Sequence, residues 1–165
     1  MTSEHLLHTI PPIYDGNSKI LILGSFPSVK SREVSFYYGH PQNRFWRGLA
    51  AVLGCAVPSS NEEKTALLQS HNIALWDVIK SCDIVGSSDS SIKNVVPNDI
   101  GVILSSCGIR QIYPNGKTSE KLFNKYINDT VGRDTVALPS TSPANASYNL
   151  ERLTDSWSVI KNNIR

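Results

Sequence analysis

One short segment, residues 36–46, combines aromatic, amide and guanidinium side chains in a way that suits binding of a heterocyclic base. It contains Tyr38, Asn43 and Arg44 among further aromatic residues. Aromatic faces stack on bases, an amide can orient water or contact a base edge, and a guanidinium can bind phosphate with its planar fork. The same aromatic residues could be ordinary core, because such side chains are usually buried for packing. The segment is therefore a candidate site whose meaning depends on its surroundings.

Polar loops follow apolar runs at several other places in the chain. Glycine, serine and phenylalanine stand at 24–26, an aspartate at 77, an asparagine and a lysine at 115–117, and a serine-rich stretch at 138–146. In parallel α/β sheets, ligands bind beyond the carboxyl ends of the strands. We expect these loops to converge with segment 36–46 on one rim of a sheet.

Alternating apolar runs and helical patterns predict the fold. The runs at 20–23, 73–76, 109–113 and 135–138 suit strands that are buried on both faces. Helical spacing of apolar residues predicts helices at about 41–53, 62–70, 97–105, 119–127 and 147–162. This order favours a three-layer α/β/α domain around a mostly parallel sheet of about four strands. The serine-rich stretch 82–98 is predicted to be a long loop, either over the rim or as a solvated linker.

Size and composition are those of one domain covering residues 1–165. The chain is 40% hydrophobic, enough for a single buried core. Its net charge of +2 permits an acidic partner without requiring one. The first apolar run is too short to span a bilayer, and no basic leader with a long apolar stretch precedes it. We expect a soluble intracellular protein, cytoplasmic or nucleoid-associated, with no membrane partner.

The cysteines and histidines show no metal-binding spacing. Cys55, Cys82 and Cys107 are isolated, so a disulfide framework or structural zinc site is not expected, and small buried hydrophobes are their predicted role. The four histidines are equally scattered. The sequence therefore predicts metal-free chemistry without a cofactor.

Together these motifs resemble the uracil-DNA glycosylase superfamily, most closely its hypoxanthine-DNA (deoxyinosine) glycosylase branch. The resemblance runs from about residue 19 to 147 and rests on segments 24–28, 36–46, 74–78, 86–98, 115–117 and 138–146. It implies a monofunctional enzyme that flips a deaminated base out of DNA and hydrolyses its N-glycosidic bond. The implied partner is double- or single-stranded DNA containing a damaged base, bound by a monomer.

The resemblance also assigns roles to individual residues. The superfamily commonly carries an Asp or Asn in its first loop, where this chain has Ser25 and Phe26. The hypoxanthine branch instead uses the Asn of an H-P-x-N-x-F-W segment, which maps onto Asn43 as the catalytic residue. The alternative is that Asn43 only braces the following helix. The implied base pocket comprises Gly24, Ser25, Phe26, Tyr38, Asp77, Asn94 and Asn115, with the Tyr38 ring stacked on the extruded base and Phe26 opposite.

The remaining candidates concern the DNA backbone and alternative activities. The implied DNA-binding residues are Ser140, Thr141, Ser142, Pro143, Asn145, Arg44 and Lys117. Activity on uracil or mismatched bases is an alternative, as is a non-catalytic lesion-binding domain on the same scaffold. A Schiff-base lyase using Lys30 or Lys117 also stays open.

Overall fold

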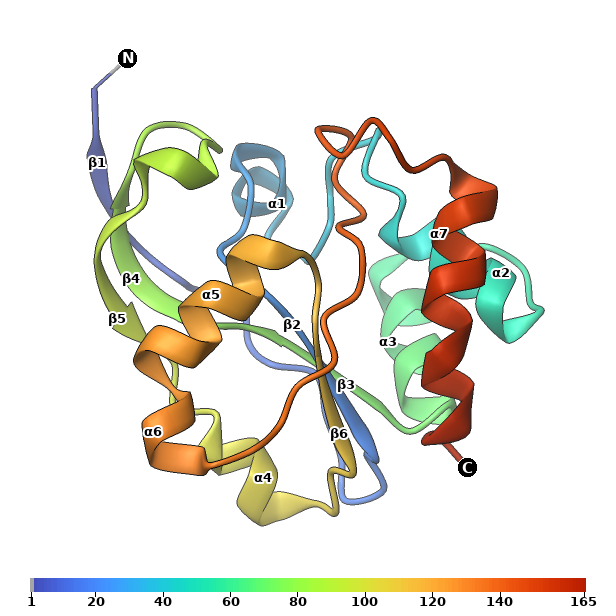
Figure 1. The fold of residues 1–165 in the computed structure, drawn as a ribbon. Coiled ribbons are helices and arrows are strands. Elements are labelled where there is room, and N and C mark those ends of the chain that lie inside the picture. The colour runs from blue at the N-terminus through green and yellow to red at the C-terminus, as the bar shows by residue number, and fades with distance from the viewer. Residues whose placement is uncertain (1) are drawn as a thin grey trace.

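Three parallel strands form the centre of the computed structural model, which describes residues 2–165 (Figure 1). The strands of the chain are β1 (Glu4–Leu7), β2 (Ile20–Gly24), β3 (Ile73–Asp77), β4 (Ile79–Ile84), β5 (Lys93–Pro97) and β6 (Gln111–Pro114). The helices are α1 (Val29–Val34), α2 (Phe45–Leu53), α3 (Asn61–Ser70), α4 (Gly101–Ser106), α5 (Lys117–Tyr126), α6 (Asn128–Val131) and α7 (Leu150–Trp157). Short 3-10 turns cover Asp89–Ser91 and Ser158–Asn162.

The parallel sheet has the strand order β3-β2-β6, so the first of its strands in the chain lies in the middle. Every residue of β2 is buried, as the apolar run at 20–23 predicts. The predicted fourth strand at 135–138 is irregular: it contacts β6 through isolated parallel bridges at Thr135 and Leu138. The mostly parallel sheet of about four strands is thus confirmed, with three regular members.

Alternating side chains of β2 divide the core into two layers. Ile20 and Ile22 pack with buried residues of α2, α3 and α7, whereas Leu21 and Leu23 pack with those of α4 and α5. Successive residues of a strand point to opposite faces, so one apolar strand holds both helix layers (Figure 1). The three-layer α/β/α prediction is confirmed.

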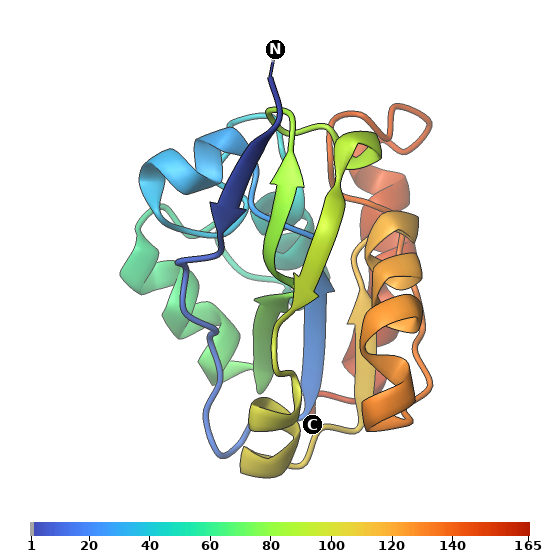
Figure 2. The same ribbon diagram turned by 90° about the vertical axis from the view of Figure 1, so that its left-hand side faces the viewer.

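The prediction of a long loop at 82–98 is wrong. After Asp77, the last residue of β3, one residue intervenes and β4 begins a second, antiparallel sheet of order β1-β4-β5 (Figure 2). Its strands carry many polar residues because antiparallel sheets can expose one face, so no continuous apolar run marks them. Only the tip, residues 86–91, is the predicted serine-rich turn. The edge strand β1 was not predicted.

Several helix starts differ from the sequence prediction. Helix α2 begins at Phe45 rather than near Pro41; no side chain caps it, and the Asn43 side chain accepts a hydrogen bond from the Phe45 N–H in the turn before it. Helix α1, absent from the sequence prediction, is capped by the Ser28 hydroxyl, which accepts from the Ser31 N–H. The last helix begins at Leu150, after an Asn149 cap, instead of at 147.

The cysteines differ in environment. Cys82 is buried, and burial raises the pKa of its thiol to about 11, in keeping with a small core residue. Cys107 is half-buried, whereas Cys55 is exposed, contrary to prediction, because it follows the glycine that ends α2 at the surface.

Across residues 2–165, no helix is both long and apolar enough to cross a membrane. The same range holds no group of three or more His, Cys, Asp or Glu side chains that could bind a metal ion.

Candidate active site

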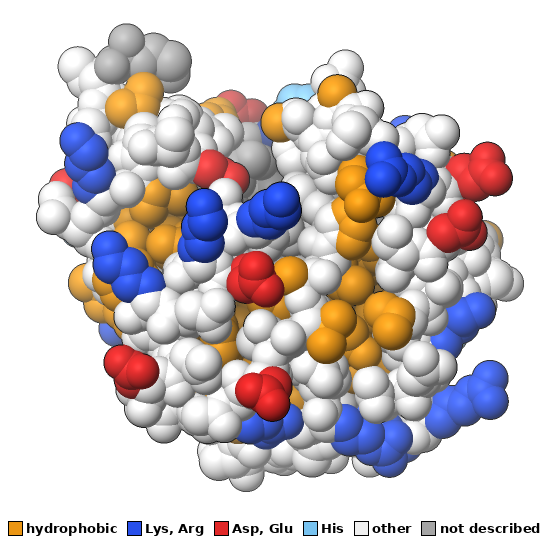
Figure 3. Space-filling model, viewed as in Figure 1, with side chains coloured by type: hydrophobic (Ala, Val, Ile, Leu, Met, Phe, Trp, Pro, Cys, Tyr) orange, Lys and Arg blue, Asp and Glu red, His pale blue; other side chains and the backbone are white. Residues whose placement is uncertain are grey.

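A cavity of about 520 Å³ lies beyond the carboxyl ends of the parallel strands, where the polar loops were predicted to meet. In the space-filling view, the surface is hollowed between the side bearing α1 and the loop 138–146 (Figure 3). The predicted site residues that line it are Gly24, Ser25, Phe26, Tyr38, Asn43, Asp77, Asn115, Ser142 and Pro143. Its volume is in the range of small-ligand sites.

The floor of the cavity depends on a residue without a side chain. A Cβ atom on Gly24 would stand 2.3 Å from Asp77 Oδ1 and 3.0 Å from the Tyr38 hydroxyl. Only glycine allows these two polar groups to approach the end of β2 so closely. Gly24 therefore sets the arrangement of the floor.

Asp77 forms a buried pair with His8, which the sequence did not single out as a site residue. Asp77 Oδ2 lies 2.7 Å from His8 Nε2, and the two side chains are 6% and 1% exposed. The His8 ring packs edge-on against Phe26 and tilted against Tyr37. A buried polar group is costly unless it is hydrogen-bonded, so the contact with His8 accounts for a carboxyl group at this position. Because 69 positions separate the two residues, no local spacing could reveal the pair.

Tyr38 contributes a ring and a hydroxyl to the cavity wall. Its ring stacks on Phe45, with centroids 4.1 Å apart and an angle of 16° between planes. Burial, and then the charge of Asp77, raise the pKa of Tyr38 well above its ordinary value, while the hydrogen bond from Asn115 lowers it. The hydroxyl therefore keeps its proton near neutral pH. Its backbone is left-handed, with φ of 52°, which is unusual for a residue with a side chain.

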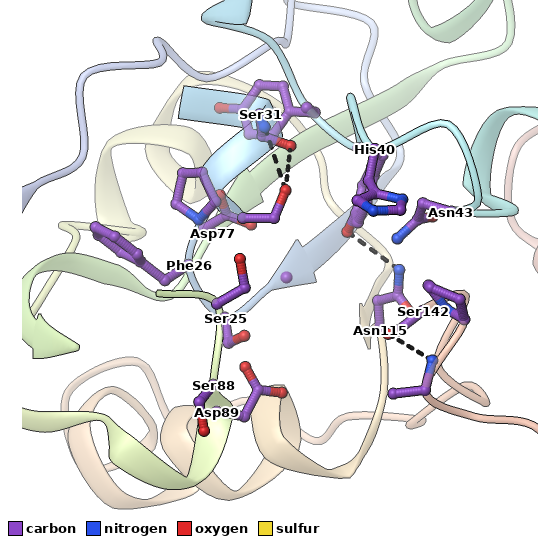
Figure 4. A pocket seen from close by; sticks show the side chains of 18 of the residues that line it. Ser25, Phe26, Ser31, His40, Asn43, Asp77, Ser88, Asp89, Asn115 and Ser142 are labelled. Carbon is purple, nitrogen blue, oxygen red and sulfur yellow. Dashed lines mark hydrogen bonds between the residues drawn. The ribbon is translucent and has the colours of Figure 1, made fainter. Parts of the chain in front are cut away.

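Asn43 lies on the cavity side of the turn that precedes α2. Its Oδ1 accepts a hydrogen bond of 2.9 Å from the Phe45 N–H, so the bracing role considered as an alternative is present. One Oδ1 lone pair and the amide NH2 group are left for other partners. In Figure 4, Asn43 lies beside His40, on the opposite side of the cavity from Ser25 and Phe26. Bracing and catalysis are thus compatible uses of one amide.

Asn115 fastens the loop 138–146 to the end of β6. Its Nδ2 donates to the Tyr38 hydroxyl and to Thr141 Oγ1, while its Oδ1 accepts from the Thr141 N–H. Thr141 is 3% exposed, so its hydroxyl faces the protein rather than a phosphate. Both residues hold the cavity wall together through these bonds.

Arg44 braces the same loop through its guanidinium. Its guanidinium donates to the carbonyls of Ser142 at 2.8 Å and Asn145 at 3.2 Å, and also to those of Thr141 and Tyr148. These acceptors occupy the planar fork that the sequence prediction assigned to phosphate. The structure instead gives Arg44 a positioning role within the protein.

Replacement of Arg44 by lysine is expected to loosen the loop it braces. A lysine ammonium cannot reproduce the planar fork, so several charge-assisted hydrogen bonds are lost, at about 2 kcal/mol of unfolding free energy. Amide hydrogen exchange in segment 139–148 should become at least about 10-fold faster. Arg47→Lys is the matched control, because Arg47 is exposed and makes only 3.5 Å contacts. Equal exchange in both variants would refute the bracing role.

The other predicted residues are placed as follows. Asn94 does not line the cavity: it lies on β5, where its amide donates to Asp83 at 2.6 Å. Ser140 and Asn145 bond within their own loop, the Asn145 amide to the Ser140 carbonyl. Lys117 is exposed at the start of α5.

Several further residues that line the cavity were not named as site candidates. The tip of the β4–β5 hairpin contributes Ser87, Ser88 and Asp89, because the Ser87 hydroxyl accepts from the Val29 N–H and holds the tip against α1. His40 also lines the cavity. Its position beside Pro41 in the segment that supplies Asn43 was a signal that could have identified it.

The comparisons with known proteins agree with this architecture. A family model described as Uracil DNA glycosylase superfamily matches residues 11–162. Two relatives are named hypoxanthine DNA glycosylase. The one from Methanosarcina barkeri is 36% identical over 82% of this chain and 85% of its own, and the one from Methanosarcina acetivorans is 33% identical over 91% and 94%.

A solved structure is similar over nearly the whole fold. It is the solution NMR structure of a Methanosarcina acetivorans protein provisionally named a uracil DNA glycosylase, with a TM-score of 0.78 and 33% identity. The match covers 92% of this chain and 94% of that one. On the strength of the fold, the cavity and these similarities, the chain belongs to the uracil DNA glycosylase superfamily.

Proposed function

We propose that this protein is a monofunctional DNA glycosylase that removes hypoxanthine from deoxyinosine in DNA. The observation that carries the proposal is Asn43: it faces the cavity, while the first loop offers only Ser25 and Phe26 at the positions where the superfamily keeps an Asp or Asn. The two relatives named hypoxanthine DNA glycosylase support the choice of base.

The substrate base must leave the duplex to enter the cavity. Extrusion costs a few kcal/mol, and less for a weak pair such as hypoxanthine with thymine. Loop 138–146 forms the rim through Ser142 and Pro143, and the exposed Lys117 lies at the start of α5, which follows the Asn115 loop. We expect a monomer to act on DNA, as the resemblance implies.

Hydrolysis in this cavity relies on position rather than on a strong base. An amide does not titrate near neutral pH, but the free lone pair of Asn43 Oδ1 can accept a hydrogen from water and so orient its oxygen toward C1′. As the N9–C1′ bond breaks, the electron pair leaves with the base, and the sugar gains positive charge that DNA phosphates stabilise. Water then adds to C1′ and loses a proton to solvent, and the base is protonated on release.

A base-release assay tests this proposal directly. Oligonucleotides carrying a single deoxyinosine, uracil or mismatch should be incubated with excess protein in EDTA, because the sequence predicts metal-free chemistry. We expect free hypoxanthine, an alkali-labile abasic site and no strand cleavage before alkali. Preferred release of uracil would reassign the base, and strand cleavage without alkali would indicate a lyase. Tight binding without release would indicate a lesion-binding domain.

A further inference from the structure

The cavity floor places a hydrogen-bond acceptor and a hydrogen-bond donor side by side. Asp77 Oδ1 and the Tyr38 hydroxyl both lie within 3.0 Å of the point where a Cβ of Gly24 would stand. Both residues line the cavity. The two polar atoms therefore face the same small region at the end of β2.

The remaining hydrogen bonds of these groups fix which atom accepts and which donates. Asp77 Oδ2 is engaged by His8 Nε2 at 2.7 Å, which leaves Oδ1 as the acceptor toward the cavity. The Tyr38 oxygen accepts from Asn115 Nδ2 at 3.1 Å, which leaves its own O–H to donate. Since the Tyr38 hydroxyl keeps its proton near neutral pH, the donor persists.

An acceptor beside a donor complements the edge that distinguishes hypoxanthine from adenine. Hypoxanthine presents an N1–H donor next to a C6=O acceptor. Adenine presents the reverse, a lone pair at N1 and an amino group at C6. An N1 lone pair facing a carboxylate oxygen is repelled, and the amino group meets a hydroxyl that is already accepting a hydrogen bond. The floor thus favours the deaminated base, which must be selected against a large excess of adenine.

We propose that Asp77 Oδ1 and the Tyr38 hydroxyl recognise the N1–H/C6=O edge of the flipped base, and that His8 is the positioning residue that holds Asp77 for this contact. The inference rests on the proposed function and deepens it by assigning base selection to three residues. Tyr38 then contributes its hydroxyl to the base edge, in place of the stacking ring that the sequence implied, and its ring stacks on Phe45.

His8 acts through Asp77 because its own side chain is enclosed. It is 1% exposed, does not line the cavity and packs against the rings of Phe26 and Tyr37. Without its Nε2 contact, Asp77 Oδ2 would be buried beside Tyr37 and Tyr38 with no hydrogen-bond partner, and the two carboxyl oxygens would be free to exchange places. His8 therefore fixes both the presence and the direction of the acceptor.

The test measures binding of analogues that cannot be cleaved, so it is independent of turnover. Duplexes carry either 2′-fluoroarabino-inosine or 2′-fluoroarabino-nebularine, a purine with hydrogen at C6 and a lone pair at N1. The quantity of interest is the ratio of the two dissociation constants, because general damage to the site changes both. Tyr113→Phe is the control for loss of a buried phenol, since its hydroxyl contacts Asn163 and lies away from the cavity.

The wild-type protein should prefer inosine. Asp77→Asn and Tyr38→Phe should each reduce that preference by at least about 10-fold, the effect of one well-made hydrogen bond. Tyr38→Phe should weaken inosine binding more than nebularine binding, because nebularine lacks O6. His8→Phe should reduce the preference, and His8→Gln should restore part of it, because a Gln amide can donate to Asp77 Oδ2. Tyr113→Phe should leave the ratio unchanged.

Three outcomes would overturn the assignment. The first is equal affinity of the wild-type protein for the two analogues. The second is an unchanged ratio of dissociation constants in Asp77→Asn and Tyr38→Phe. The third is the wild-type ratio in both His8→Phe and His8→Gln. Circular dichroism melts of each variant identify unfolding. Failure of the proposed function has a different signature: ordinary deoxyinosine is not hydrolysed by the wild-type protein, whatever the binding ratio.

Discussion

Replacement of Asn43 by alanine is expected to slow single-turnover release of hypoxanthine by at least about 100-fold, the scale of losing one well-placed transition-state contact. The substitution removes the amide that orients water but leaves the buried residues Phe45 and Trp46 in place. Binding of deoxyinosine DNA should be retained. The measurement is a rapid-quench time course with protein in excess over an oligonucleotide that carries one deoxyinosine.

Stability must be separated from chemistry in this variant, because Asn43 also accepts from the Phe45 N–H. Loss of this hydrogen bond costs about 1 kcal/mol of unfolding free energy, which thermal melts can measure. Gln42→Ala is the matched control: Gln42 is the exposed neighbour and does not line the cavity. Near-normal cleavage by Asn43→Ala would place the catalytic group elsewhere, with Asp77 the next candidate.

Addition of one methyl group at Gly24 is expected to reduce base release by about 100-fold while the fold persists. The new Cβ would stand 2.3 Å from Asp77 Oδ1, which cannot retreat freely because His8 holds the other oxygen. Asp77 and the Tyr38 hydroxyl must shift, and displacements of about 1 Å at a reacting site can cost that much. Single-turnover rates and the affinity for deoxyinosine DNA should both fall in Gly24→Ala.

Gly16→Ala is the matched control for the effect of a methyl group on a glycine. No heavy atom lies within 4 Å of a Cβ at Gly16, so this variant should match the wild type in rate and affinity. Normal turnover by Gly24→Ala would mean that the floor can rearrange without loss, which contradicts the close approach that we assign to this position.

The parallel core could be predicted from sequence because its physical signal is local. β2 is an unbroken apolar run, and the apolar side chains of α2 recur at helical spacing. The antiparallel sheet could not be predicted in the same way. Its strand β4 mixes buried residues with Lys80 and Asp83, and its pairing with β1 is decided by residues about 75 positions away. Such long-range pairing leaves no period in either strand.

The same distinction between local and long-range signals applies to the candidate site. Residues at or just after strand ends, such as Ser25, Asp77 and Asn115, could be placed at the rim from topology alone, and they line the cavity. What each side chain contacts was beyond prediction. Arg44 was expected to bind phosphate because of its charge, but backbone carbonyls of a loop about 100 positions later occupy its donors. Nothing in the sequence near position 44 encodes that competition.

The edge strand β1 leads directly into His8, the residue on which the proposed base recognition depends. Its four residues pair on one side only, with β4, and the next residue is His8, whose N–H bonds to the Lys80 carbonyl. Short strands at the edge of a sheet, with few buried contacts, open at a lower free energy than the core. Each opening would withdraw His8 from Asp77 while α2 and Asn43 stay folded. Under the proposed recognition scheme, warming would therefore erode discrimination between bases before it erodes the capacity to cut, so the first few residues of the chain act as a thermal limit on accuracy.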